Sequence, residues 1–304
     1  AGACVVLLAI ILFVGSRSNL LQNYDWGSKY AYAVLRALPP NAILFVSGDV
    51  DLGPIAYYHM IEGQRPDITL YQWKGLVLGN RLFHPLRTNE KAVHQRLREF
   101  IEAARDPVEM SLIVFGGYAQ RDHWLFSEVD ESSRDPKKVT VDIPSEMRQF
   151  FEQSILHTHD SNAWIAFHQD EFRGRYAELL GRSLRRGQPL DARTQSDLEA
   201  LTQDYYGALG LAQGMLLNPN GYSAGEVIAL LDRAQKLTPL DVPKAYLSKY
   251  FAIRGLLRAN QNDRSGAIDD LKTAFSVWPS PNNLAVRSLE QIYQDAGDKQ
   301  ALNA

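Results

Sequence analysis

The stretch AILFVSGDVDLGPIAYYHMIEGQRPDITLY, residues 42–71, carries the pattern from which the fold of the first half of the chain is predicted. It starts with a continuous apolar run, residues 42–46, of the kind that forms a strand buried on both faces of a parallel sheet. A polar turn at 47–51 and a helix over 53–62 follow, and residues 67–71 form a second strand. This order of elements is a βαβ unit, so we predict a parallel sheet.

The sequence on either side extends the α/β pattern. Residues 24–38 and 89–105 carry apolar side chains at helical spacing. We expect a third buried strand at 110–115 and an edge strand at 139–143, separated by a charged surface loop. The fold class predicted for residues 24–148 is therefore α/β, as a small parallel-sheet, Rossmann-like domain of three layers.

From about residue 149 onward the pattern is helical almost to the C-terminus. We therefore predict that residues 149–304 form an all-α array. The predicted helices cover residues 145–157, 161–184, 193–217, 223–237, 243–260, 264–277 and 282–296.

One part of this array, residues 241–279, has the spacing of a tetratricopeptide repeat. Small residues at Gly255 and Ala267 would let the two helices of the repeat cross closely, and a proline would end the second helix. The six residues that fit the repeat frame are Phe251, Gly255, Ala267, Leu271, Ala274 and Pro279. A weaker copy of the second half of the frame lies at Val227, Leu231, Ala234 and Pro239, and another repeat starts at 284–301.

Arrays of this kind usually bind peptides or neighbouring domains on a concave face. The alternative is that the helices only pack against the α/β domain. The sequence does not decide between these two roles.

The N-terminal residues 2–14, GACVVLLAIILFV, form an uncharged apolar run. It is shorter than the roughly 20 residues that a spanning helix needs. It is read as the end of a transmembrane helix that starts upstream, as a signal-peptide core, or as a buried strand or helix. The first reading assigns residues 1–17 to the end of a transmembrane helix. Arg17 follows the run, but one charge does not settle the orientation.

Composition excludes some classes of function. The chain has 304 residues, a length that suggests about two domains, and a net charge of −3, which is not typical of a nucleic-acid-binding surface. Cys4 is the single cysteine, so neither an internal disulfide nor a cysteine metal site can form.

Candidate ligand residues follow the first predicted strand. Ligands favour the carboxyl ends of strands in open α/β sheets, which places Asp49 and Asp51 on one rim with the 72–88 loop and Gly116-Gly117. The two carboxylates could contact a cation or a sugar, or could cap the next helix. The glycines of a dinucleotide-binding fingerprint and a Walker loop are absent.

The histidines do not define a metal site. His157 and His159 are two residues apart and do not share a helix face, and a helix end capped by Asp160 explains the same residues. We expect His59 to be half-buried and hydrogen-bonded. The sequence contains no nucleophile elbow, and we predict neither a metal site nor a complete catalytic motif.

A family resemblance rests on PNAILFVSGDVD, residues 40–51, and GQRPDI, residues 63–68. This pattern resembles the segment after the last membrane helix in bacterial multi-pass proteins related to protein O-mannosyltransferases, of the GT-C superfamily of membrane glycosyltransferases. The upstream apolar run and the downstream tetratricopeptide-like repeats fit the same resemblance. The matching residues are Gly48, Asp49, Asp51, Arg65, Pro66 and Asp67. This sequence has Val50 and Leu52-Gly53 where relatives often carry a more polar stretch. This difference argues against a polar ligand pocket in this chain at these positions.

The resemblance implies a polytopic enzyme of the bacterial inner membrane that uses a polyprenyl-phosphate-linked sugar as donor. Its catalytic acidic residue would lie in the first extracytoplasmic loop, which this sequence does not contain, so no catalytic residue or cofactor is carried over. This chain would be the periplasmic C-terminal region, which assists binding of a protein or glycan acceptor.

The same resemblance adds Arg65 and Asp67 to Asp49 and Asp51 as candidate ligand residues. A structural role competes with that assignment, because Arg65 could pair with Asp67 or Asp49 and fix the strand–helix turns. The alternative function is a membrane-anchored tetratricopeptide scaffold without sugar chemistry. A soluble α/β enzyme is a third reading, and its expected motifs are missing.

Overall fold

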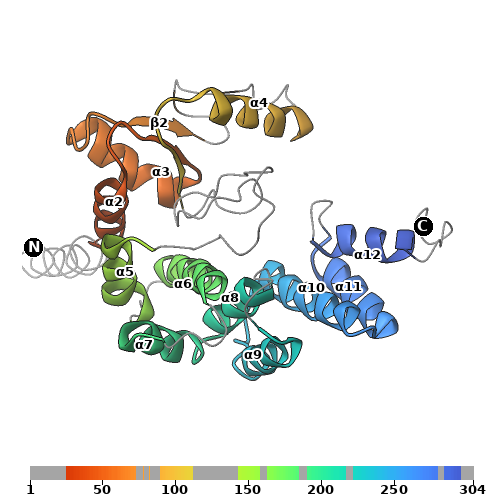
Figure 1. Ribbon diagram of the computed structural model, residues 1–304. Coiled ribbons are helices and arrows are strands. Elements are labelled where there is room, and N and C mark those ends of the chain that lie inside the picture. Colours follow the sequence, from red (N-terminus) through yellow and green to blue (C-terminus); the bar gives the residue numbers. More distant parts are fainter. Residues whose placement is uncertain are drawn as a thin grey trace, which may run out of the picture. The chain divides into compact units, whose positions relative to one another are not determined.

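The structure is a computed structural model that describes residues 25–72, 78, 82, 90–111, 143–157, 163–184, 190–216, 222–279 and 284–295. These residues form many helices and a three-stranded parallel sheet (Figure 1). The chain divides into two compact units, and the boundary falls between Gln169 and Asp170, inside helix α6 (Ala163–Ser183).

The first unit is built around strand β1 (Ile43–Val46). Strands β2 (Thr69–Gln72) and β3 (Val108–Met110) pair with it on either side in parallel, so the strand order is β2-β1-β3. Its apolar run places Leu44 and Phe45 in the core, where they are 0% and 1% exposed. The predicted βαβ arrangement of a parallel sheet is confirmed.

Helices surround this sheet. The first unit contains α2 (Asp25–Ala37), α3 (Asp49–Ala56) with its π-helical continuation η1 (Tyr57–Ile61), α4 (Glu90–Ala103), and α5 (Ser145–Phe151) with its π-helical continuation η3 (Glu152–Leu156). Helix α4 packs on the sheet through Leu97, which forms a cluster with Phe45. Tyr30 of α2 is fully buried and its ring lies 5.5 Å from that of Phe150 of α5.

The domain boundary expected at residue 148 differs from this division. Helix α5 contains residue 148 and η3 follows it, and both pack with the first unit, because Phe150 and its neighbour Phe151 are buried beside α2. Helical periodicity shows that a segment is a helix but does not show which core it joins.

Two elements of the first unit start earlier than predicted. Helix α3 begins at Asp49, so Asp49 and Asp51 lie in its first turn and not in a polar turn before it. Gly48 makes this early start feasible, because its φ of 75° lets the chain reverse directly after the strand. Strand β3 begins at Val108, whereas the pattern predicted residues 110–115, of which 112–115 lie outside the described residues.

Some predictions fall on parts of the chain that are not described. These include the apolar run 2–14 and all but Ile143 of the predicted edge strand. Among the described residues, no helix is both long enough and apolar enough to cross a membrane.

The second unit is entirely helical within the described residues. After the C-terminal part of α6 come α7 (Ala192–Leu201), α8 (Tyr205–Leu216), α9 (Ala224–Lys236), α10 (Lys244–Asn260), α11 (Arg264–Val277) and α12 (Leu284–Asp295). Helix α8 packs on α9, α10 packs on α11, and α12 packs on α11. The predicted helical array is therefore present.

The single helix predicted over residues 193–217 is instead two helices, α7 and α8. The carboxylate of Asp204 accepts a hydrogen bond from the Gly207 amide at 2.9 Å and so caps the new helix. Gly207 also packs so tightly that an added Cβ would lie 2.3 Å from the Leu201 carbonyl oxygen. The hydrophobic period does not reveal this break, because apolar residues continue on both sides of it.

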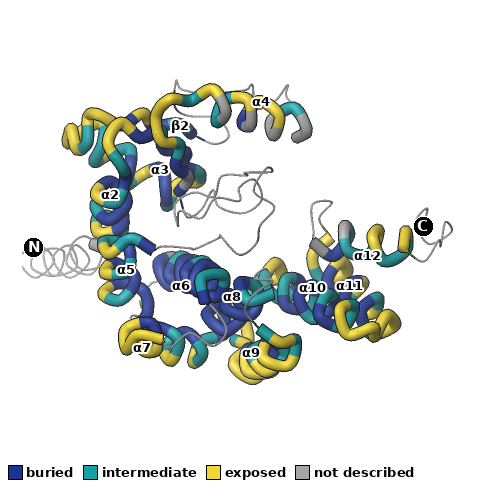
Figure 2. Tube along the Cα trace, viewed as in Figure 1, coloured by how far each residue is buried: buried dark blue, intermediate teal, exposed yellow. Residues whose placement is uncertain are grey.

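Glycines let α6 and α8 cross with their backbones almost in contact. A Cβ added at Gly210 would lie 2.2 Å from the Gly174 carbonyl oxygen, and one added at Gly214 would lie 2.1 Å from that of Glu178. Both helices are mostly buried, as the dark blue tubes of α6 and α8 in Figure 2 show. This crossing fixes the part of α6 that carries a buried group of charges.

Candidate functional site

The carboxylate of Asp51 joins β1, α2 and β3 at the carboxyl end of the sheet. Asp51 is 0% exposed, and its Oδ1 accepts a hydrogen bond of 2.7 Å from Tyr30 Oη. Its Oδ2 accepts one of 2.9 Å from the Ser47 amide and another from Ser111 Oγ. Three donors from three parts of the chain therefore compensate the burial of this charged group.

Arg65 and Asp67 form a second group of polar contacts at the opposite end of the sheet. Arg65 Nε donates to Asp67 Oδ1 and Nη2 donates to Oδ2, both at 2.8 Å. Asp67 also accepts a hydrogen bond from the Asn41 amide at 3.0 Å, directly before β1. The pKa of Asp67 is held well below its usual value by the hydrogen bonds from Arg65 and, next, from Asn41.

The same guanidinium closes the C-terminal end of α2. Arg65 Nη1 donates to the carbonyl oxygens of Leu35 at 2.6 Å and Leu38 at 2.8 Å, and Nη2 donates to that of Pro39 at 2.8 Å. The last carbonyls of a helix have no partner inside it, so a cation there satisfies them and complements the helix dipole. Of the two partners predicted for Arg65, the structure shows Asp67.

The four candidate ligand residues therefore do not form one rim. Asp51 lies at the carboxyl end of β1, whereas Arg65 and Asp67 lie near the amino ends of β1 and β2. Asp49 is exposed in the first turn of α3, where its negative charge interacts favourably with the positive N-terminal end of the helix dipole. The family resemblance groups these four residues, but Asp51 and the Arg65–Asp67 pair lie at opposite ends of β1.

The remaining candidates of the first unit are only partly described. Most of the 72–88 loop and Gly116-Gly117 lie outside the described residues, as does His159. His59 is half-buried and its Nδ1 lies 3.1 Å from the Gln64 carbonyl oxygen, as expected. In the described parts of the chain, no group of three His, Cys, Asp or Glu residues could hold a metal ion.

In the second unit, the residues of the predicted repeat frame meet between α10 and α11. Ala267, Leu271 and Ala274 are each 0% exposed. Gly255 on α10 lies against them, since an added Cβ would be 2.8 Å from Leu271 Cγ. Pro279 follows the end of α11 at Val277, as its effect on the preceding residues predicts.

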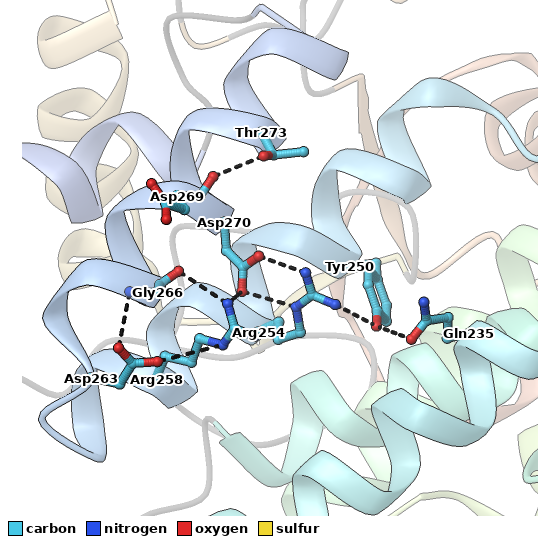
Figure 3. Close-up of polar contacts among 9 residues, drawn as sticks. All are labelled: Gln235, Tyr250, Arg254, Arg258, Asp263, Gly266, Asp269, Asp270 and Thr273. Carbon is cyan, nitrogen blue, oxygen red and sulfur yellow. Dashed lines mark hydrogen bonds and ion pairs between the residues drawn. The ribbon is translucent and has the colours of Figure 1, made fainter.

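A polar network ties the same two helices together (Figure 3). Arg254 donates to both oxygens of Asp270, with distances of 2.9 Å from Nε and 2.6 Å from Nη2. Arg258 Nη1 lies 3.0 Å from the same carboxylate. The Arg254 guanidinium also lies over the ring of Tyr250, 5.3 Å from its centre. It therefore contacts an aromatic ring of its own helix α10 and a carboxylate of α11.

A buried carboxylate with three cations around it joins α6 to α10. Glu178 is 2% exposed, and Arg182 Nη2 donates to its Oε1 at 2.7 Å. Arg175 Nη1 and Lys249 Nζ both lie 3.9 Å from its Oε2. Burial alone raises the pKa of Glu178, but the charges of Lys249, Arg182 and Arg175 outweigh it and lower the pKa.

Lys249 shows the opposite balance. Burial lowers its pKa to about 8, and the attraction of Glu178 offsets this less than fully because Arg175 and Arg182 repel the ammonium. This group of charges was not predicted from the sequence. The sequence feature that indicates it is the spacing of Arg175, Glu178 and Arg182, which places them on one face of α6. The lysine comes from a later helix, α10.

Comparisons with protein-family models, with curated protein sequences and with solved structures find no match for this chain. Each polar group described above links helices or strands of its own unit, and the buried carboxylates of Asp51, Glu178 and Asp270 each have a partner of opposite charge or a set of donors. Such groups stabilise the packing of these helices and strands.

Proposed function

We propose that this chain is the C-terminal extracytoplasmic portion of a polytopic membrane glycosyltransferase. The donor would be a polyprenyl-phosphate-linked sugar, and catalysis would reside in a membrane part outside this sequence. The chain would lie in the periplasm, where its α/β unit follows the last membrane helix and its helical array helps to hold the protein or glycan acceptor.

The observation that supports this proposal is that the residues of the family-like motif make the contacts that hold the α/β unit together. Asp51 binds three donors at one end of β1, and Arg65 and Asp67 hold the turns at its other end. A motif whose residues agree with the local fold in this way is consistent with the α/β unit that the resemblance to the glycosyltransferase tail implies. It supports membership of the family without requiring chemistry from these residues.

We also propose the finer assignments of fold. The parallel sheet with helices around it favours a Rossmann-like unit, although only three strands lie within the described residues. The α10–α11 pair favours a tetratricopeptide repeat, because Gly255 meets Ala267 and Leu271 where that repeat requires a close crossing. The frame of Val227, Leu231 and Ala234 is buried on α9 in the same way, which supports a second copy.

The helical array supports the acceptor-holding role. Successive helix pairs in such arrays leave a continuous surface that can bind an extended chain. Phe275 on α11 is 43% exposed, and Leu240 before α10 is exposed, so apolar groups are available on this unit. Catalysis by this chain is not part of the proposal, and we predict no sugar transfer by residues 18–304 alone.

The second candidate is a membrane-anchored tetratricopeptide scaffold without sugar chemistry. The helical array favours it as much as it favours the first proposal, because the same surface could bind any protein. The two candidates differ in the polypeptide that precedes the chain. A glycosyltransferase requires about ten further apolar spans, with an acidic residue in the first outer loop, whereas a scaffold requires one anchor.

A topology and size measurement separates these candidates. Alkaline phosphatase fused after Ala304 of the native polypeptide should be active, because that enzyme folds only outside the cytoplasm. An antibody raised against this chain should detect a membrane polypeptide far larger than 34.2 kDa, the mass of the chain itself. A band near that mass would favour the scaffold, and an inactive fusion would contradict the periplasmic location.

A further inference from the structure

The π-helical segment η1 carries a group of exposed apolar side chains. Tyr57, Met60 and Ile61 are 50%, 61% and 72% exposed and lie within five residues of one another. The Glu62 amide donates to the Tyr57 carbonyl oxygen at 3.2 Å, which gives the wide turn of a π-helix. Such turns and such exposed apolar groups both occur often at functional surfaces.

This apolar patch, defined as Tyr57, Met60 and Ile61, is attached to the N-terminal part of α2 (Asp25–Ala37). Tyr58 Oη donates to Ser28 Oγ at 3.0 Å, and the Tyr58 ring lies 4.5 Å from that of Tyr32. Pro54 of α3 lies against Gly27, since an added Cβ there would be 3.5 Å from Pro54 Cγ. The first turns of α2 therefore position the segment that carries the patch.

The start of α2 is close in sequence to the apolar run 2–14. Residues 15–24 separate the end of the run 2–14 from α2. Ten residues span at most about 35 Å even when fully extended. If the run enters a membrane, the first turns of α2 and the patch attached to them are within reach of that membrane surface.

We infer that the apolar patch inserts into the interfacial region of the phospholipid bilayer that residues 2–14 enter, and thereby holds the α/β unit against the membrane. Tyrosine suits the headgroup level of a bilayer, and the Met and Ile side chains suit the boundary with the acyl chains. Glu62 forms the polar edge of the patch, where its carboxylate accepts a hydrogen bond of 2.8 Å from Tyr57 Oη. The inference rests on the membrane location in the proposed function.

The single cysteine makes a direct test practical. The whole chain carrying Cys4→Ser and Met60→Cys is labelled with an environment-sensitive fluorophore and reconstituted with phosphatidylethanolamine and phosphatidylglycerol vesicles. A matched control carries Cys4→Ser and Ala103→Cys, which labels an exposed position on α4 of the same unit. Flotation of the vesicles separates membrane-bound from free chain before the fluorescence is recorded.

The inference predicts that the label at position 60 shifts to the blue on reconstitution and loses emission when doxyl-labelled lipid is included, whereas the label at position 103 does neither. Chain that floats but keeps a label at position 60 open to aqueous iodide overturns the inference and leaves the anchoring intact. A label shielded from iodide but not quenched by lipid also overturns it, because a protein surface then covers the patch. Failure to float contradicts both the anchoring and the inference.

Discussion

Arg65 and Asp67 are two residues apart in the chain and form an ion pair of two hydrogen bonds, each 2.8 Å long. Arg65 adopts a φ of 50°, which is unfavourable for a residue with a Cβ. This backbone conformation turns the side chain back onto the end of α2, where it donates to three carbonyl oxygens. One arginine thus fixes α2 and the approach to β2 together.

This ion pair makes stability depend on pH. The pKa of Asp67 is lowered in the folded chain, so its stabilising effect is complete above the unfolded pKa of about 4 and is lost as the pH falls below that value. We expect Asp67→Asn to lower the free energy of unfolding at pH 7 and to have a smaller effect near pH 2. Urea unfolding of both proteins from pH 2 to pH 7 measures the difference, and a difference that is constant with pH would contradict the pairing.

The two acidic residues after β1 should respond differently to substitution. Asp51→Asn removes the charge from all three hydrogen bonds and replaces one acceptor oxygen with an NH2 donor that faces a buried donor, so it should cost about 1–3 kcal/mol of unfolding free energy. Asp49→Asn removes only an exposed charge near a helix N-terminus and should cost less than about 1 kcal/mol. If both substitutions lower the free energy of unfolding equally in chemical denaturation, the carboxylate of Asp51 is not a buried acceptor of three hydrogen bonds.

The close crossing of α6 and α8 should not accept a methyl group. Gly214→Ala places a Cβ against the Glu178 carbonyl oxygen and should destabilise the second unit by about 1–3 kcal/mol. Gly225→Ala is the matched control, because Gly225 lies in α9 with only Ser223 Oγ nearby, at 3.8 Å. That substitution should be neutral or stabilising by up to about 1 kcal/mol, as is usual in helices. Thermal unfolding that is the same for both variants would exclude the tight crossing.

Lys249 should make the second unit more stable as the pH rises above 8. Its folded pKa is lowered to about 8, whereas an exposed lysine titrates near about 10.4, so the unfolded chain binds more protons between these values. The free energy of unfolding should therefore rise across this range in the native chain relative to Lys249→Met, in which the group is absent. Paired denaturation curves at pH 7, 8, 9 and 10 test this, and parallel pH profiles would show that Lys249 is not desolvated.

Much of the fold follows from local patterns in the sequence. The run 42–46 gives the central strand because five apolar residues in succession suit a strand covered on both faces. The helices from α9 to α12 lie within two residues of the predicted ranges, because amphipathic period and end signals coincide there. The repeat frame also places Gly255 correctly against Leu271.

What the sequence did not show depends on contacts between distant residues. The family resemblance groups Asp51 with Asp67, yet the partners of Asp51 include Tyr30 and Ser111, which no spacing rule connects to it. The break before α8 depends on a cap at Asp204, which lies inside an otherwise continuous helical pattern. The Glu178–Lys249 contact requires knowing that α6 and α10 lie together in the second unit.

Sugar transfer by the intact polypeptide that contains this chain is the direct test of the proposed function. The polypeptide is purified from native membranes through an antibody to the helical array and supplied with polyprenyl-phosphate mannose or polyprenyl-phosphate glucose and a serine- and threonine-rich acceptor peptide. We predict transfer by the intact polypeptide and none by the 304-residue chain alone. Transfer by the isolated chain would contradict the proposed function. An intact polypeptide that runs near 34.2 kDa and shows no transfer would contradict it as well.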